Sequence, residues 1–308
     1  MRIKVILFGP PGRGSFNESG LAGVERARAA GVPADVIWVQ SDGPAMRAAR
    51  LMDICLHGAD LVVLHGGQGD YPVTVVADRF PHIHFVIIQG SYTAPNAASY
   101  EVLQEQSAFL AGVAAAAETR SGVVGHLSGE RIRPGLKGRA AYVDGVLRQR
   151  PDTALLTTFC GNPHDPELAF DTFAAMAARQ ADTVFAMIDG GRDGAIDACR
   201  AFGVRQIGNV LDWTERHPDV FLASAIANCG RCIETAILDF YRGAVDFGAK
   251  TVFGLDQPDY VRLILNDSVC HEARVAVDDW AQRLLDGTVL PADQYYGEEF
   301  EPMLERGA

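Results

Sequence analysis

The stretch SYEVLQEQSAFLAGVAAA, residues 99–116, begins with polar residues and continues as an apolar segment rich in small side chains. An uninterrupted apolar run of this length predicts a buried helix. The segment Gly122–Leu127 (GVVGHL) follows and is typical of a strand, because it is short, apolar and bounded by glycine. The pattern of strands and helices that precedes this stretch restarts near Gly122. The sequence therefore predicts two similar lobes.

Short apolar runs alternate with Ala-rich helical segments on both sides of this stretch. The expected strands are Ile3–Phe8, Val36–Val39, Leu61–Leu64, His84–Ile88, Val123–Leu127, Ala154–Phe159, Thr183–Ile188, Gln206–Asn209 and Phe221–Ser224. The expected helices include Leu21–Ala30, Ala45–His57, Ala169–Gln180 and Ile196–Phe202. Strands that are apolar on both faces and separated by helices predict doubly wound parallel sheets, which is an α/β fold with right-handed crossovers.

Length and charge limit the function classes. A chain of 308 residues that is 48% hydrophobic can bury a large core, and its length predicts about two domains. No window approaches the roughly 18 consecutive apolar residues of a membrane span. The formal net charge of -12 would repel phosphate backbones, so nucleic acid is not an expected partner. The expected partner is a small molecule or another protein.

The N-terminal sequence and the cysteine content indicate the cellular compartment in which the protein works. Only four apolar residues, Val5–Phe8, separate Met1–Lys4 from Gly9, which is too short for a secretory signal. Six cysteines in a chain that is not a small disulfide scaffold fit a reducing compartment. We therefore expect a cytoplasmic protein, or a periplasmic one if a leader was trimmed.

Ligands of open parallel sheets bind beyond the carboxyl ends of the strands, so the loops after the strands are candidate sites. In the loop after the first strand, Gly9 and Gly14 have the spacing of a phosphate-binding loop, but Ser15 stands where its lysine would be. In the loop after the third strand, the Gly67 backbone permits close approach, and Gln68 offers both a donor and an acceptor. A plain turn is the alternative there. Ser91 and Tyr92 follow the fourth strand.

Three loops of the second lobe also carry polar side chains, and two of them contain glycine as well. They comprise residues 159–165, 189–194 and 209–213. Their candidate ligand residues are Phe159, Asn162, His164, Asp189, Asn209 and Asp212. Two loop sets on two lobes predict a ligand cleft between the lobes that closes on the ligand.

Four stretches resemble one known family, the basic membrane protein or PnrA-like receptors, which are periplasmic-binding-protein-like (type 1) and capture purine nucleosides. They are Ser15–Asn17, Gly66–Phe85, Glu105–Ala116 and Asp165–Asn228. The resemblance implies two lobes joined by a multi-strand hinge, one comprising residues 1–120 with about 250–285, the other 121–249 with about 286–308. It also implies a small-molecule ligand, no cofactor and, for an exported chain, an ABC-transporter permease as partner.

The resemblance assigns Ser15, Phe16 and Asn17 to the ligand, with Phe16 stacked on the purine. In the alternative, Phe16 only packs the start of the helix against the core. This chain departs from the family where Gly12 and Arg13 replace acidic residues. It departs again at Val210, where the family has an aspartate that grips ribose hydroxyls, and at Ala227, where it has a lysine.

Ribose hydroxyls need charged or amide partners in a closed site, and these departures remove two of them. A free nucleobase or another flat heterocycle with polar edges is therefore the expected ligand. Arg13 would add a cation for a carboxylate on that ligand.

A cytoplasmic enzyme that hydrolyses a heterocyclic ring in the same cleft is the alternative function. Cys229 and Cys232 open a helix beside an arginine, and both features lower the pKa of a thiol. Together with Cys160 and His164 they would supply a nucleophile and a base. The competing interpretation is that the cysteines are ordinary core residues. Of the two functions, the sequence favours a binding protein without covalent chemistry.

Overall fold

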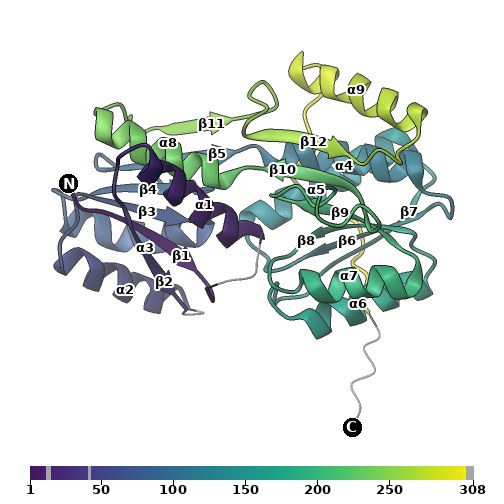
Figure 1. Ribbon diagram of the computed structural model, residues 1–308, viewed down its shortest axis with the longest axis horizontal. Coiled ribbons are helices and arrows are strands. Elements are labelled where there is room, and N and C mark those ends of the chain that lie inside the picture. The colour runs from purple at the N-terminus through teal and green to yellow at the C-terminus, as the bar shows by residue number, and fades with distance from the viewer. Residues whose placement is uncertain (12–14, 41–42, 303–308) are drawn as a thin grey trace, which may run out of the picture. The chain divides into compact units, whose positions relative to one another are not determined.

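The computed structural model describes residues 1–11, 15–40 and 43–302. The chain folds into two compact lobes (Figure 1). Lobe one comprises residues 1–102 and 228–253, and lobe two comprises residues 103–227 and those from 254 onward. The chain therefore passes between the lobes three times. Two α/β lobes with several connections confirm the predicted fold class.

Lobe one is built on a six-stranded sheet in the order β11-β5-β4-β3-β1-β2, in which every pairing is parallel. The strands are β1 (Ile3–Phe8), β2 (Asp35–Val39), β3 (Leu61–His65), β4 (His84–Ile88), β5 (Ala97–Val102) and β11 (Lys250–Phe253). The helices are α1 (Ser15–Ala29), α2 (Pro44–Leu56), α3 (Asp70–Val76) and α8 (Cys229–Arg242), with short 3-10 turns at Gly67–Gly69 and Ala77–Arg79. Helices α1 and α8 pack together, and so do α2 and α3. Strand β3 is buried along its whole length, as expected for a strand between two helical layers.

Lobe two repeats this plan with a sheet in the order β12-β10-β9-β8-β6-β7. Only the pairing of β12 with β10 is antiparallel among these strands. The strands are β6 (Val123–Ser128), β7 (Ala154–Phe159), β8 (Thr183–Met187), β9 (Arg205–Asn209), β10 (Phe221–Ala227) and β12 (Val261–Leu265). The helices are α4 (Gln104–Glu118), α5 (Arg133–Gln149), α6 (Pro166–Ala178), α7 (Arg192–Phe202) and α9 (His271–Leu285).

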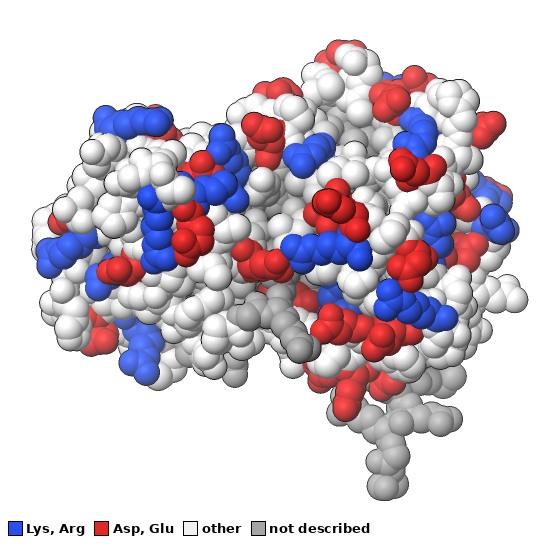
Figure 2. All heavy atoms as spheres, viewed as in Figure 1, with Lys and Arg blue, Asp and Glu red and all other residues white. Residues whose placement is uncertain are grey.

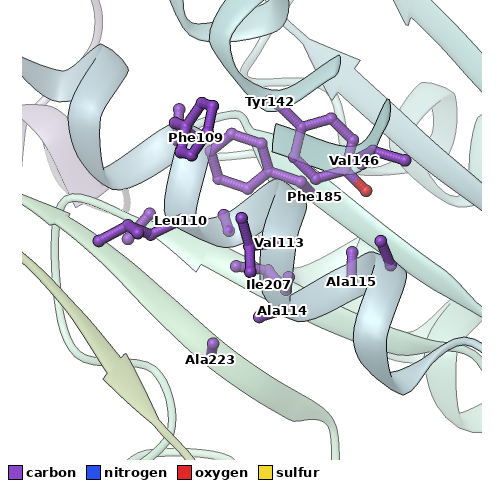
Figure 3. Close-up of a cluster of buried hydrophobic side chains, with 14 of the residues drawn as sticks. Phe109, Leu110, Val113, Ala114, Ala115, Tyr142, Val146, Phe185, Ile207 and Ala223 are labelled. Atoms are coloured by element: carbon purple, nitrogen blue, oxygen red, sulfur yellow. The ribbon is translucent and has the colours of Figure 1, made fainter. Parts of the chain in front are cut away.

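The apolar stretch of the sequence forms the core of lobe two. Figure 3 shows side chains of α4 packed against α5 and the sheet, with the Phe109 ring near those of Tyr142 and Phe185. The Tyr142 and Phe185 centroids are 5.2 Å apart. Burying several aromatic and aliphatic side chains here contributes about 1.5–3 kcal/mol each.

The predicted lobe boundaries were wrong in three places. Helix α4 was assigned to lobe one but packs on α5, since a Cβ atom on Gly112 would lie 2.1 Å from the Tyr142 carbonyl oxygen. Helix α8 was assigned to lobe two but packs on α1, where a Cβ atom on Gly23 would lie 2.0 Å from the Gly230 oxygen. Residues 254–285 belong to lobe two, because β12 pairs with β10. Glycine permits these backbone approaches, which helical periodicity does not reveal.

The C-terminal segment after α9 packs on lobe two. The segment 286–302 lies on lobe two, where the Phe300 N–H donates to the Thr157 carbonyl oxygen over 2.8 Å. Within the described parts of the chain, no helix is both long and apolar enough to cross a bilayer. The face drawn in Figure 2 carries acidic and basic side chains interspersed over both lobes.

Candidate functional site

In lobe one, Phe16 and His65 form an aromatic pair at the carboxyl end of the sheet. Phe16 lies in the first turn of α1, and His65 is the last residue of β3. Their ring centroids are 3.9 Å apart and their planes meet at 17°. The His65 Nε2–H donates to the Phe16 carbonyl oxygen over 2.8 Å. The histidine thereby fixes both the ring and the backbone of Phe16.

The imidazole of His65 is neutral at physiological pH. Burial lowers its pKa to about 4, and its side chain is 1% exposed. Close packing against α1 requires Gly20, since a Cβ atom there would lie 2.8 Å from His65 Cδ2. His65 was not among the residues that the sequence predicted for the ligand. Its position directly before the Gly66–Gly67 pair was the available signal.

Gln68 lies beside the same aromatic pair. Gly66 has φ of 121°, a conformation that favours glycine. A Cβ atom on Gly66 would lie 2.3 Å from Gln68 Oε1 and 3.4 Å from Phe16 Cε1. The carboxamide of Gln68 and the ring of Phe16 therefore flank one glycine, and both side chains are partly exposed. The structure thus brings together two residues that the sequence predicted for the ligand, with Gly67 between Gly66 and Gln68.

The other predicted residues of lobe one make contacts within the protein. Asp70 accepts hydrogen bonds from Ser91 Oγ at 2.7 Å and from the Tyr92 N–H at 3.1 Å. These bonds hold the loop after β4, and Tyr92 packs against the core of the lobe. Asn17 is buried and donates from Nδ2 to the Phe8 carbonyl oxygen over 2.9 Å, which ties α1 to β1. Arg13 and the side chain of Ser15 lie outside the described residues.

In lobe two, Phe159 lies beneath two arginines at the end of β7. The guanidinium carbons of Arg131 and Arg139 are 4.9 and 4.7 Å from its ring centroid. Glu299 binds both guanidinium groups, at 2.5 Å from Arg139 Nη1. The hydrogen bond from Arg131 is the largest cause that lowers the Glu299 pKa to about 2. Cation–π contacts and ion pairs together fix the Phe159 ring.

The loop after β7 places Asn162 and His164 near Asp189. Asn162 Oδ1 accepts a hydrogen bond from the His164 N–H over 3.0 Å, so its Nδ2 is the group left to donate. His164 Nδ1 lies 4.0 Å from Asp189 Oδ2. Asp165 caps α6 by accepting from the N–H groups of Glu167 and Leu168.

A buried arginine holds Asn209 at the end of β9. Arg192 opens α7, is 2% exposed, and donates from Nη2 to Asn209 Oδ1 and to the Ile188 carbonyl oxygen. Its guanidinium carbon lies 4.6 Å from the Trp213 ring centroid. Burial lowers the Arg192 pKa to about 10, partly offset by the charge of Asp189. Neither Arg192 nor Trp213 was predicted as part of the site.

Asp212 serves the turn that follows Asn209. Its Oδ1 accepts from Thr214 Oγ1 at 2.6 Å and from Ser224 Oγ at 3.3 Å. Val210 in the same turn has φ of 69°, which is strained for a β-branched residue. Both contacts of Asp212 are internal, and they stabilise the strained turn.

The cysteines are not activated. Cys229 and Cys232 are fully buried at the start of α8, and burial raises their pKa values, that of Cys229 to about 12. Burial also raises the Cys160 pKa to about 11. The expectation of lowered thiol pKa values was wrong, because loss of hydration outweighs the helix N-terminus. Across the described residues, no three His, Cys, Asp or Glu side chains come together as a metal site.

Comparisons of the sequence with known proteins and protein families agree with one another. The profile of a family described as "ABC transporter substrate-binding protein PnrA-like" matches residues 2–289. The chain is 24% identical over 196 residues to the transcriptional activator protein Med of Bacillus subtilis, covering 64% of this chain and 61% of Med. It is 22% identical over 232 residues to a purine-binding protein of Brucella abortus, covering 75% of this chain and 66% of that protein. The chain thus spans less than two thirds of either relative's length.

A solved structure supports the fold. The solute-binding protein of an ABC transporter system from Aeropyrum pernix superimposes with a TM-score of 0.83 at 21% identity. The match covers 94% of this chain and 92% of that protein. At this identity the likeness concerns the arrangement of strands and helices.

Proposed function

The chain belongs to the PnrA-like family of ABC transporter substrate-binding proteins, and from this premise we propose that it binds a free nucleobase or a similar flat heterocycle without altering it. The observation that carries the proposal is the pair formed by Phe16 and His65, with centroids 3.9 Å apart. A partly exposed phenyl ring fixed from behind offers a flat apolar surface to a flat ligand. Gln68 beside it offers a donor and an acceptor to the ligand's edge.

A base fits this chain better than a nucleoside. Val210 and Ala227 stand where the family resemblance implies an aspartate and a lysine, and their side chains are 4% and 3% exposed. Neither side chain can hydrogen-bond a hydroxyl. A ribose would therefore lose part of its hydration without replacement, at a cost of about 1–3 kcal/mol for each unpaired group.

Catalysis is not favoured. The family is one of substrate-binding proteins, and the candidate thiols have raised pKa values. A thiol held protonated is a poor nucleophile. The ligand would therefore leave the protein chemically unchanged.

The family implies a small-molecule ligand and a transporter as partner. We propose delivery to an ABC-transporter permease for an exported chain. A sensor role is the second candidate for a chain that stays in the cytoplasm, supported by its similarity to the activator Med. Both roles use one ligand site.

A thermal-shift screen followed by mass spectrometry tests this proposal. The panel contains nucleobases, their nucleosides and carboxylated imidazoles. The expected result is stabilisation by a free base, since a ligand at 100 times its Kd adds about 2.7 kcal/mol, and recovery of that base unchanged. Stabilisation by nucleosides alone would contradict the proposed ligand class, and a changed ligand mass would contradict the absence of chemistry.

A further inference from the structure

The amide of Asn209 is held in one orientation. Arg192 Nη2 donates to it, and a guanidinium has donors only, so the amide atom that faces Arg192 must be the oxygen. The backbone of Asn209 is held as well, because Trp213 Nε1 donates to its carbonyl oxygen over 3.1 Å. Asn209 therefore cannot exchange its oxygen and its NH2 group by rotation without breaking a charged hydrogen bond.

Arg192 itself is well anchored. Its Nη2 also donates to the Ile188 carbonyl oxygen over 2.6 Å, at the end of the neighbouring β8. Its guanidinium stacks on Trp213, with the carbon 4.6 Å from the ring centroid. Trp213 is 8% exposed and Arg192 only 2%. Nη2 makes the hydrogen bonds that hold this buried guanidinium, and moving it would leave the Nη2 donors without partners.

We infer that Arg192 is a specificity-determining residue, because it turns the NH2 group of Asn209 toward the ligand and so selects a heterocycle with a hydrogen-bond acceptor at that edge. This inference rests on the proposed function and names a subclass of its ligands. Asn209 is the last residue of a parallel strand and is partly exposed, which places it where ligands of open sheets bind. A ring carbonyl that faces the NH2 group accepts a hydrogen bond from it. An exocyclic amino group in the same place is itself a donor and cannot accept that hydrogen bond.

An amide whose oxygen already accepts a hydrogen bond also occurs in the loop after β7. Asn162 Oδ1 accepts from the His164 N–H, so Asn162 likewise has its NH2 group to offer. Two loops of lobe two thus have amide donors available. A carbonyl-bearing base such as hypoxanthine fits this pattern, and its amino counterpart adenine does not.

Titration calorimetry with hypoxanthine and adenine tests the inference. The native protein is expected to bind hypoxanthine at least about tenfold more tightly, since a site built around a hydrogen bond strongly rejects a ligand that cannot make it. In Arg192→Met the amide is free to rotate and can offer its oxygen to the amino group of adenine. Adenine should therefore bind more tightly than it does to the native protein, and the ratio of the two affinities should fall to about 1. Arg216→Met is the matched control, because it removes the other guanidinium over Trp213, at 5.2 Å, and should preserve the ratio.

A second variant covers failure of Arg192→Met to fold. Asn209→Asp replaces the NH2 group by an acceptor, retains a partner for Arg192 and should abolish the preference for hypoxanthine. The side-chain NH2 signal of Asn209, assigned in ¹⁵N-labelled protein by its loss in Asn209→Asp, gives a readout beyond affinity. That signal should shift when hypoxanthine is added to the native protein.

These measurements separate the role of Arg192 from the binding of a base. If a base binds but the Asn209 signal stays in place, or if Arg192→Met keeps the native preference, this inference is overturned while the proposed function stands. If neither base binds to the native protein, both fail.

Discussion

The phenyl ring of Phe16 lies 3.9 Å from the imidazole of His65, and His65 Nε2 donates to the carbonyl oxygen of the same phenylalanine. One buried side chain thus holds both the ring and the backbone at the start of α1. Because the imidazole is itself fixed by burial, Phe16 has little freedom to lose on binding. The Phe16 ring is thus fixed in the absence of ligand, which is what the proposed stacking on a flat ligand requires.

Removing the ring should weaken ligand binding. Phe16→Ala is expected to raise the Kd for the base about tenfold or more, since base–aromatic stacking contributes about 1–3 kcal/mol. Phe16→Trp keeps a flat ring and should retain most of the affinity. Titration calorimetry compares the three proteins. An unchanged Kd in Phe16→Ala would remove Phe16 from the site.

Stability should fall in mildly acidic solution. Burial lowers the pKa of His65 to about 4 and that of His126 to about 3, from an unfolded value of 6.5. Between pH 6.5 and 4 the unfolded chain binds more protons than the folded one, so these groups leave stability intact above pH 6.5 and reduce it as the pH falls.

Urea denaturation of His65→Gln checks this dependence. Native protein loses about 2 kcal/mol between pH 7 and 5 through His65 alone, at 1.36 kcal/mol for each pKa unit. The variant should show a pH dependence smaller by that amount. Equal dependences in both proteins would show that His65 is not buried as a neutral group.

The turn after β9 should prefer glycine to alanine. Val210 has φ of 69°, a region that costs a residue with a Cβ atom about 1–2 kcal/mol. Val210→Ala and Val210→Gly both lose the buried isopropyl group, so their comparison isolates the backbone. Val210→Gly should be more stable by about 1 kcal/mol in denaturation experiments. If Val210→Ala were the more stable of the two variants, the turn would not be strained.

Glu299 should stabilise lobe two. Its carboxylate binds Arg131 and Arg139, and Arg139 is 6% exposed. Glu299→Gln should lower the free energy of unfolding by about 1–3 kcal/mol, because a buried guanidinium loses its charged partner. Glu298→Gln is the matched control at an exposed neighbouring position and should have a small effect. Similar stability of the two variants would contradict a role for Glu299.

The sequence predicted the elements whose apolar pattern is local. The strands from Ile3 and from Thr183 follow directly from such patterns, and both exist. Strand β5 was missed because it carries Ser99 and Glu101, which are polar yet buried. Glu101 is paired over 2.8 Å with Lys250 of β11, a partner 149 residues away that local periodicity cannot reveal.

The candidate site could be predicted from the sequence only in part. The family resemblance proposed Phe16, and the loop after the third strand proposed Gln68. The structure places the two side chains together, because parallel strands bring their carboxyl ends to one edge. The orientation of Asn209 could not be predicted, since it depends on a buried arginine 17 residues away. The thiol pKa values were mispredicted for a related reason: burial, which dominates them, is a property of the folded lobe.

Titration calorimetry of the native protein with hypoxanthine and with its nucleoside inosine shows whether the site is built for a free base. We expect one base to bind per chain, at least about tenfold more tightly than the nucleoside, because the ribose hydroxyls lack partners. Mass spectrometry of the recovered base should show it unchanged. Tighter binding of inosine than of hypoxanthine would show that the site accommodates the ribose, contrary to the proposed function.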